Sequence, residues 1–449
     1  MGTQADGGHC FAERLPRTVS AENHETNRFV AARAAPRFRA CIRTSSVPAR
    51  SNSGHTNLSL SEFLGQEAYH LARPRRQKLI HSPALKATHA TGRVLGLPVN
   101  ITVSVSYRCN SRCKTCNVWL LPNDDLELDE WDRVFESLGR APYWFTFSGG
   151  EPTLRKDLPD MVASAYRHCR PGIINIPTNG IQHKIIPGRI EQVLRAAPES
   201  EVIINLSLDG VGTRHDELRG VRNNWAHAME TYQALKELKA SYRHLTLGIH
   251  TVISNFNVDT FPELCEYVQR ELKPDSYITE IAEERVELDT VGLGITPTAE
   301  KYTVAIDALL ESLRDQHLTG VAGVTQAFRR QYYELVKRTL REHRQVIPCL
   351  AGVASAQIAP NGDVWTCCIR AQSMGNLREH DYDFGSVWRT GEARELRRSI
   401  KAGECYCPLA NAAYTNMLMH APTVSRVAAD VARSHVPARR HATRHEPPT

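Results

Sequence analysis

The sequence predicts an α/β fold in which parallel strands form a partial barrel, and three observations support this prediction. Six apolar, β-branched runs alternate with helical patterns between residues 99 and 281, as in consecutive βαβ units. The runs are apolar throughout, as expected for strands covered on both faces. Polar motifs follow strand after strand, which is typical of a barrel whose ligands bind at the carboxyl ends of its strands. A doubly wound open sheet would give the same alternation, and only the third observation favours the barrel.

The predicted elements follow one another in a regular order. Strands are expected at Val99–Ser106, Tyr143–Phe147, Ile173–Pro177, Val202–Leu208, Leu245–Ile253 and Tyr277–Ile281. Helices are expected at Asp129–Leu138, Lys156–His168, Ile190–Ala196, Trp225–Ala240 and Phe261–Leu272. Two more helices, over residues 299–314 and 327–344, are expected to lead away from the barrel.

Length, composition and charge narrow the function classes. The 449 residues, 41% hydrophobic and 23% charged, allow one large domain and a smaller one. No apolar run approaches the roughly 18 residues that span a bilayer. Residues 1–58 hold eight Arg and four acidic residues, and residues 421–449 hold five Arg and two, so the net charge of +6 resides in the two ends. A nucleic-acid groove needs its cations on the folded body, which makes a nucleic-acid partner the minority interpretation.

Twelve cysteines are present, and their clusters indicate metal chemistry in a reducing cytoplasm. Cys109, Cys113 and Cys116 form a Cys-x3-Cys-x2-Cys array directly after the first predicted strand. Three is an odd number for disulfides, and a tetrahedral zinc site would need a fourth ligand nearby. Three thiolates can hold an iron–sulfur cube and leave one iron free for an outside ligand. A zinc knuckle or reduced structural cysteines are the alternatives.

Polar residues follow the next strands in turn. Gly149-Gly150-Glu151 comes after the second, where glycines allow close approach to a ligand and the carboxylate can accept from an ammonium group. Thr178-Asn179 and Ser207-Leu208-Asp209 follow the third and fourth, each before a Gly, and such sequences are also ordinary turns. The acids after the sixth strand are expected to form a solvated charge run, with binding of a cationic or hydroxylated substrate as the alternative: Glu280, Glu283 and Glu284.

The cysteine array and the Gly-Gly-Glu motif together resemble those of the radical SAM enzymes. One departure is Thr115, at a position where the family often has an aromatic residue. The resemblance implies an incomplete (β/α)6 TIM-type barrel, a [4Fe-4S] cluster on the three cysteines, and S-adenosyl-L-methionine bound at the open iron. It also implies cleavage to a 5′-deoxyadenosyl radical, hydrogen abstraction from a peptide or small molecule, and an electron donor such as flavodoxin or ferredoxin.

The resemblance extends to the polar motifs. It implies that Gly149, Gly150 and Glu151 contact the methionine amino group. It places Thr178, Asn179, Ser207 and Asp209 near the carboxylate and ribose of the cofactor. Arg219, in the segment 214–220, is a candidate for binding a cofactor or substrate carboxylate.

A second cysteine set follows the barrel, and it consists of Cys349, Cys367, Cys368, Cys405 and Cys407. The Pro-Asn-Gly-Asp turn at residues 360–363 predicts a hairpin that carries Cys367 back toward Cys349. This region resembles the SPASM and twitch auxiliary-cluster domains. The full SPASM form carries more cysteines, so the twitch form with one further [4Fe-4S] cluster fits better. The implied ligands are Cys349, Cys367, Cys405 and Cys407, with Cys368 as the spare; a zinc ribbon is the alternative.

These observations divide the chain into segments. We expect a disordered extension over residues 1–58, a helical lead-in over 59–96, the barrel over 97–290, a helical linker over 291–346, a small α+β cluster-binding domain over 347–412, and a largely disordered tail over 413–449. An iron–sulfur redox or sensor protein that does not cleave S-adenosylmethionine is one alternative function. An RNA-modifying radical SAM enzyme is the other.

Overall fold

The computed structural model describes residues 83–434, except residue 93 and residues 314–319. The predictions for residues 1–58, for most of 59–96 and for the last 15 residues of the tail lie outside the described residues. Residues 83–91 form a helix whose Leu85 is buried against Leu350, Val353 and Ala354. This part of the predicted lead-in therefore packs on the segment that contains Cys349.

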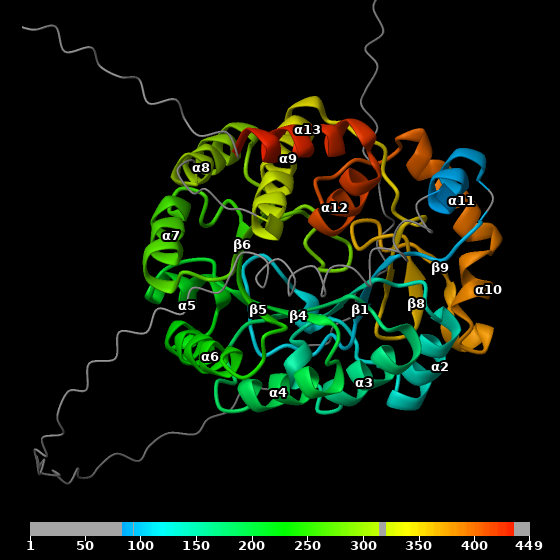
Figure 1. The fold of residues 1–449 in the computed structure, drawn as a ribbon, viewed down its shortest axis with the longest axis horizontal. Helices are drawn as coiled ribbons and strands as arrows, with labels where there is room; N and C mark the ends of the chain where they lie inside the picture. Colours follow the sequence, from blue (N-terminus) through cyan, green and yellow to red (C-terminus); the bar gives the residue numbers. More distant parts are fainter. Residues whose placement is uncertain (1–82, 93, 314–319, 435–449) are drawn as a thin grey trace, which may run out of the picture. The chain divides into compact units, whose positions relative to one another are not determined.

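A nine-stranded sheet forms the centre of the described structure, in the order β6-β5-β4-β3-β2-β1-β7-β8-β9 (Figure 1). The first six strands are parallel to one another, and each lies where a strand was predicted. Within the described residues the edge strands β6 and β9 do not pair, so the sheet stays open and the predicted partial barrel is confirmed. The strands of this barrel part are β1 (Asn100–Ser104), β2 (Trp144–Ser148), β3 (Ile173–Thr178), β4 (Glu201–Ser207), β5 (Leu245–Ile253) and β6 (Ser276–Ile281).

The helices between these strands lie along one side of the sheet (Figure 1). All five predicted helices are present, and a further one, α5, precedes α6. They are α2 (Leu128–Leu138), α3 (Leu158–Cys169), α4 (Ile186–Ala196), α5 (Thr213–Arg219), α6 (Asn224–Lys239) and α7 (Phe261–Tyr267), which continues as the π-helix η3 (Val268–Leu272). Two 3-10 helices, η1 (Val118–Leu120) and η2 (Pro152–Leu154), follow the cysteine array and Glu151.

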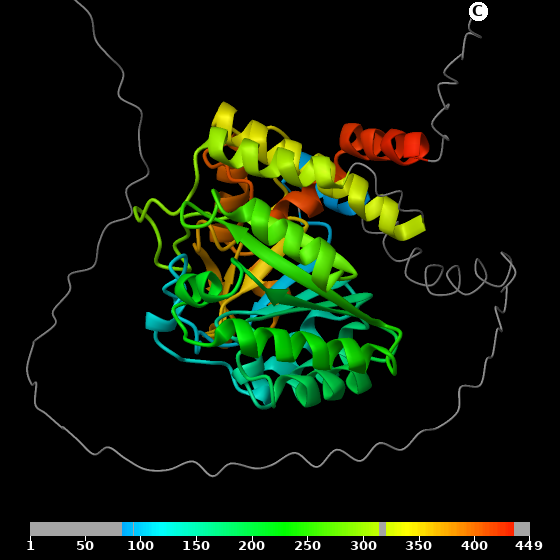
Figure 2. The same ribbon diagram turned by 90° about the vertical axis from the view of Figure 1, so that its left-hand side faces the viewer.

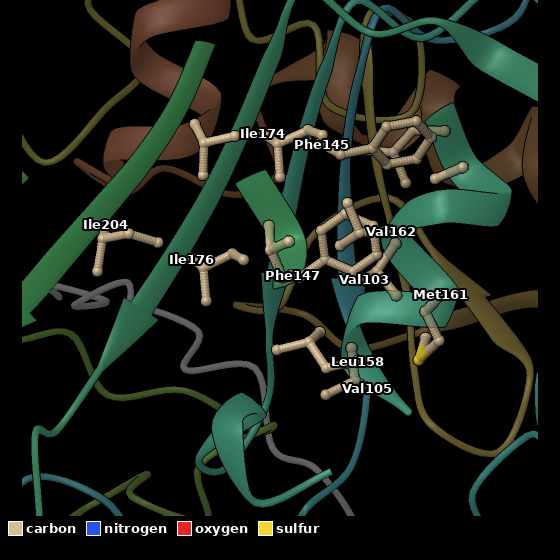
Figure 3. Packing of buried hydrophobic residues seen from close by; sticks show 14 of the residues in the cluster. Val103, Val105, Phe145, Phe147, Leu158, Met161, Val162, Ile174, Ile176 and Ile204 are labelled. Carbon is tan, nitrogen blue, oxygen red and sulfur yellow. The ribbon is translucent and has the colours of Figure 1, made fainter. Parts of the chain in front are cut away.

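The two faces of the sheet differ in chemistry. Alternate side chains on the strands, such as Phe147, Ile176 and Ile204, are fully buried with Met161 and Val162 of α3 (Figure 3). Because side chains alternate along a strand, the residues between them face the barrel interior. These are often polar, and in one example Asn205 Nδ2 donates to Asn175 Oδ1 at 2.8 Å. The strands therefore combine an apolar outer face with a polar inner face.

The region that follows Cys349 extends the same sheet. Strand β7 (Ser355–Ile358) pairs in parallel with β1, so that Asn100 lies opposite Ser355. Strands β8 (Asp363–Trp365) and β9 (Ser373–Asn376) continue antiparallel, and the predicted hairpin at residues 360–363 is confirmed. The helices η4 (Leu377–His380), α10 (Phe384–Trp388) and α11 (Gly391–Ala402) complete this small α+β region.

The helices expected to lead away from the barrel do not do so. In α8 (Ala299–Ser312) and α9 (Gly320–Glu342), the buried Tyr302 and Tyr333 pack with Ile253 and Ile281 at the ends of β5 and β6. The prediction of a helical linker that leaves the barrel is therefore wrong. The physical reason is that both helices carry an apolar face, which is stabilised by burial against the open end of the sheet.

The prediction of a largely disordered tail is also wrong as far as residue 434. Helices α12 (Ala410–Met419) and α13 (Ala421–Ser434) occupy this segment, and α13 lies beside α9 (Figure 2). Val427 of α13 is buried, and Gln331 Nε2 of α9 donates to Asp430 Oδ2 at 2.9 Å. A weak apolar pattern is sufficient here because a partner helix is available. Among the helices that the structure describes, none is long and apolar enough to cross a membrane.

Candidate functional site

The three cysteines of the array lie on one loop that follows β1, and all three are half-buried. Burial raises the pKa of Cys109 to about 11 and that of Cys116 to about 12. The backbone N–H of Ser111 donates to Cys109 Sγ at 3.4 Å. Since metals bind thiolates, iron would have to displace the protons of these thiols on binding. The donor set is three sulfurs on a short loop, which fits the open-corner cluster implied by the sequence.

Gly149 and Gly150 hold this loop through backbone contacts. Gly150 N donates to Ser106 O at 2.7 Å, and Glu151 N donates to Arg108 O at 2.9 Å. A Cβ on Gly150 would lie 2.2 Å from Arg108 O, and Gly149 has a φ of +120° that other residues rarely adopt. We predicted close approach to a ligand at these glycines. The structure shows that the close approach is to the backbone just before Cys109.

The Glu151 carboxylate, which follows β2, is hydrogen-bonded to the polar residues at the end of β3. It is buried and accepts from Thr153 N at 3.2 Å, from Thr178 Oγ1 at 2.9 Å and from Asn179 N at 2.7 Å. Burial nevertheless raises its pKa above the usual value. Asn179 Nδ2 also donates to Asn110 Oδ1 at 2.7 Å, next to Cys109. The structure therefore brings Glu151, Thr178 and Asn179 together with the cysteine loop.

The polar motif after β4 includes Asp209, whose side chain contacts other residues of the protein. Ser207 ends β4 and is half-buried. Asp209 is buried, and its Oδ1 accepts from Val252 N at 2.9 Å while its Oδ2 lies 2.9 Å from Arg219 Nε. We predicted a direct cofactor contact for Asp209. The described contacts show a carboxylate whose two oxygens are occupied by a backbone N–H and by Arg219.

Arg219 connects Asp209 to the cysteine array. Its Nη1 donates to Cys113 Sγ at 3.6 Å. Burial alone would lower the pKa of Arg219, but Asp209 and Cys113 raise it above the usual value, so the guanidinium stays charged. The sequence predicted this residue only as a candidate for binding a cofactor or substrate carboxylate. The only sequence signal for its position beside the cysteine loop was the glycine that follows it. In the structure Gly220 adopts a φ of +63°, and a Cβ there would lie 2.4 Å from Arg112 O.

Helix α5 holds the cysteine loop with its backbone as well. Arg112 N donates to Arg219 O, and Lys114 N donates to Leu218 O, both at 2.9 Å. His215 in the same helix is fully buried, and its Nδ1 accepts from Asp209 N at 3.2 Å. Burial, together with nearby Arg219, lowers the pKa of His215 to about 3. The imidazole is therefore neutral and serves as an acceptor that orients the Asp209 backbone.

Four cysteines of the second set line one cavity, and they are Cys349, Cys367, Cys405 and Cys407. Burial raises the pKa of Cys349 to about 11 and also raises those of Cys367, Cys405 and Cys407. Gln345 joins two of their segments, because its Nε2 donates to Cys405 O at 2.9 Å and its Oε1 accepts from Cys349 N at 3.4 Å. The cavity lining holds no Asp, Glu or His among the described residues. Four thiols with no carboxylate or imidazole among them fit a cluster with full cysteine ligation.

Cys368 does not line this cavity, although it packs beside Leu409 and Ala412, which do. Its Sγ accepts from Arg285 Nη1 at 3.7 Å, and Glu287 lies beside it. Arg285 also forms an ion pair at 3.2 Å with Glu283, which is 8% exposed. The expectation of a solvated charge run is therefore wrong for Glu283, because its partner Arg285 makes burial of the carboxylate tolerable. Burial raises the pKa of Glu283 to about 7.

The other two predicted acids have separate partners. Glu280 lies 3.4 Å from His250 Nε2 on the neighbouring strand. The Glu284 carboxylate accepts from the backbone N–H groups of Gly292 at 2.6 Å and Gly294 at 2.8 Å. Both acids therefore hold local structure in the described region, on β5–β6 and on the loop after β6.

Comparisons with known proteins agree with this geometry. The model of the Radical SAM superfamily matches residues 103–268, and that of the SPASM iron-sulfur cluster-binding domain matches residues 349–408. A PqqA peptide cyclase of Xanthomonas euvesicatoria is 26% identical over 312 residues, which cover 66% of this chain and 75% of the relative. The mycofactocin maturase MftC of Mycobacterium tuberculosis is 27% identical over 340 residues, covering 72% and 79%.

A solved structure shares the fold. The crystal structure of Streptococcus suis SuiB bound to precursor peptide SuiA superposes with a TM-score of 0.51 at 15% sequence identity, over 84% of this chain and 82% of that one. The two matched family models show that the chain contains a radical SAM domain over residues 103–268 and a SPASM domain over residues 349–408. More specifically, it is a radical SAM enzyme with a C-terminal SPASM domain. Its cofactors are S-adenosylmethionine, the [4Fe-4S] cluster that binds S-adenosylmethionine, and auxiliary iron–sulfur clusters. We favoured the abbreviated twitch form, and the matched family is the SPASM domain.

Proposed function

We propose that this enzyme reductively cleaves S-adenosylmethionine and abstracts hydrogen from a peptide substrate. When bound, the cluster and S-adenosylmethionine supply one-electron cleavage of a carbon–sulfur bond and a radical that removes hydrogen from unactivated carbon. The observation that supports this function best is the clamp on the cysteine loop. The loop that carries the three thiols is held by backbone contacts with Gly150 and with α5.

The proposed ligands of the first cluster are Cys109, Cys113 and Cys116. The two clamps fix the loop backbone, so the three sulfurs are presented without a large ordering cost on binding. Arg219 stabilises negative charge on the Cys113 sulfur through its charge-assisted contact. These residues would hold the cluster and leave the fourth iron to the methionine end of the cofactor.

Three groups near this corner suit the methionine end. Glu151 Oε2 accepts one hydrogen bond, from Asn179 N, and retains capacity for an ammonium group. Arg219 has a fixed positive charge for the carboxylate. Ser207 offers a hydroxyl at the end of β4. In this assignment Gly149 and Gly150 shape the loop, Thr178 and Asn179 hold Glu151, and Asp209 positions Arg219.

The auxiliary cluster would be bound by Cys349, Cys367, Cys405 and Cys407. Full cysteine ligation leaves no iron for a substrate, so this centre would relay electrons. We leave Cys368 out of the set because its sulfur contacts Arg285 and does not line the cavity. The barrel interior between the two centres would shield the radical from water.

The peptide class rests on the relatives, since the matched cyclases are named for the PqqA peptide. A small molecule is the alternative substrate, and no side chain in the site decides between the two. We propose flavodoxin or ferredoxin as the source of electrons. Candidate peptides encoded beside the gene can be tested directly, because modification by hydrogen loss changes the peptide mass.

Anoxic reconstitution tests the proposed function. Two clusters require about eight irons per chain, and dithionite should then yield 5′-deoxyadenosine from S-adenosylmethionine. Cys113→Ala should abolish this product, whereas Cys368→Ala should retain it. About four irons with no 5′-deoxyadenosine would instead indicate an iron–sulfur redox or sensor protein. Zinc at the first site would exclude the proposal altogether.

A further inference from the structure

The cysteine loop carries a group of exposed cationic side chains. Arg108, Arg112 and Lys114 alternate with the cysteines along the loop, and all three are exposed. Arg112 is fixed by its surroundings, since it stacks over Trp119 at 4.2 Å and donates from Nη1 to Cys109 O at 2.8 Å. Arg108 and Lys114 have no ion pair within the described residues. Lys114 Nζ lies 5.8 Å from the centre of the Phe256 ring, a contact that does not neutralise its charge, so both charges can act on an approaching molecule.

A fourth cation joins them from a distant part of the sequence. Arg222 is exposed in the turn between α5 and α6. Gly220, two residues earlier, packs on the Arg112 backbone. Arg222 has no ion pair in the part of the chain that the structure describes. We call Arg108, Lys114 and Arg222 the loop cations.

The two acidic residues of α5 near this face do not cancel the loop cations. Glu217 is paired with Arg214 at 2.9 Å. The Asp216 carboxylate is used at the start of α6, where it accepts from Asn223 N and Trp225 N, each at 2.7 Å. The excess of positive charge is local, because the chain between residues 58 and 421 is close to neutral as a whole. A local field of this kind attracts anionic surfaces and orients them on approach.

We propose that the loop cations form the docking surface for an acidic electron-transfer protein that reduces the first cluster. The proposal rests on the proposed function, since it requires a cluster on Cys109, Cys113 and Cys116. In each encounter one electron passes from the reduced carrier, which is oxidised, to the cluster, which is reduced, and no proton or group is transferred. The loop is the suitable place because the same short segment carries the ligands and faces solvent.

A charge-reversed variant tests the surface with two reductants. In the triple variant Arg108→Glu, Lys114→Glu, Arg222→Glu, 5′-deoxyadenosine formation driven by reduced flavodoxin should fall at least about tenfold at low ionic strength. Formation driven by dithionite should be unchanged, because a small reductant needs no docking surface. Added salt should slow the flavodoxin reaction of the natural enzyme and leave the variant nearly unaffected. Arg112 is kept, since it holds the loop.

A matched control separates local charge from net charge. Lys236→Glu, Arg394→Glu, Arg398→Glu changes the net charge by the same amount at exposed positions on α6 and α11, and it should react with flavodoxin at the natural rate. Equal losses with both reductants would overturn the proposal and assign the cations to the substrate or to cluster assembly, which iron content would report. An unchanged flavodoxin rate in the first variant would also overturn it. Failure of the natural enzyme with dithionite would instead refute the proposed function.

Discussion

Arg219 Nη1 lies 3.6 Å from Cys113 Sγ, although 105 residues separate them along the chain. The same guanidinium forms an ion pair with Asp209 at 2.9 Å. The Cys113 thiol, in the loop that follows β1, is thus tied to Asp209 in the loop after β4 by one buried cation. Stability of the fold and chemistry at the first site therefore depend on the same side chain.

Removing this cation should destabilise the protein strongly. Arg219→Met leaves the Asp209 carboxylate buried without its partner, and we expect the free energy of unfolding to fall by about 3–5 kcal/mol. The double variant Asp209→Asn, Arg219→Met should recover part of this loss, because no charge is then stranded. Urea unfolding under anoxic conditions measures both. Arg270→Met breaks an exposed ion pair with Glu266 and should cost no more than about 1 kcal/mol; an equal loss there would contradict the argument.

Gly150→Ala should remove the first cluster and spare the second. The new Cβ would meet Arg108 O at 2.2 Å and Tyr107 O at 2.8 Å, and these are backbone atoms that cannot turn aside. The cysteine loop would have to move, so we expect about half of the iron to be lost, with no 5′-deoxyadenosine formed. Gly188→Ala is the control, because nothing lies within 4 Å of its Cβ position in α4. Full iron content in Gly150→Ala would show that the clamp is dispensable.

Two adjacent cysteines should behave differently. Cys367→Ser removes a sulfur from the cavity of the second set, so the auxiliary cluster should be lost. Cys368→Ser changes a side chain that contacts Arg285 and Glu287, so both clusters should remain. Iron analysis and electron paramagnetic resonance of the reduced proteins distinguish the outcomes. Loss of the cluster in the Cys368 variant alone would reverse the ligand assignment.

Acid should destabilise the protein through His215. Its pKa is lowered to about 3 in the folded state. In the unfolded chain the same imidazole takes up a proton below its ordinary pKa of 6.5. The stability from this residue is therefore complete above pH 6.5 and is lost as pH falls toward 3. Between pH 7 and pH 5 the loss should be about 2 kcal/mol. Urea unfolding of His215→Asn, which keeps an acceptor for Asp209 N but does not titrate, should show a correspondingly weaker pH dependence.

Local sequence patterns predicted the barrel well. Each of the strands β1 to β6 coincides with an apolar run, and β5 has the bounds expected for it, Leu245–Ile253. The rim motifs were also recognisable, because each follows a strand whose end can be located from periodicity. The structure accordingly groups Glu151, Thr178 and Asn179 beside the cysteine loop. These features depend on residues that are close together in the sequence.

The features that were missed depend on long-range pairing. No local sequence pattern predicts that β7 pairs with β1, or that Arg219 contacts Cys113. The tail was assigned to disorder because its apolar pattern is weak by itself, and the partner of α13 is α9, which lies about 100 residues earlier. Glu283 was expected in a solvated charge run because nothing local in the sequence shows that Arg285 pairs with it in the interior.

The pairing of β7 with β1 means that the SPASM region is no detachable module. Val99 and Asn100 also donate to Ala354 O just before β7, so the join begins at the very start of the barrel. A fragment that ended after α9 would leave one hydrogen-bonding edge of β1 bare, a few residues from Cys109, and bare edges recruit other chains. Transplanting this region between enzymes would therefore require its first strand to be matched to the recipient's β1, because a mismatched strand would leave that edge unpaired.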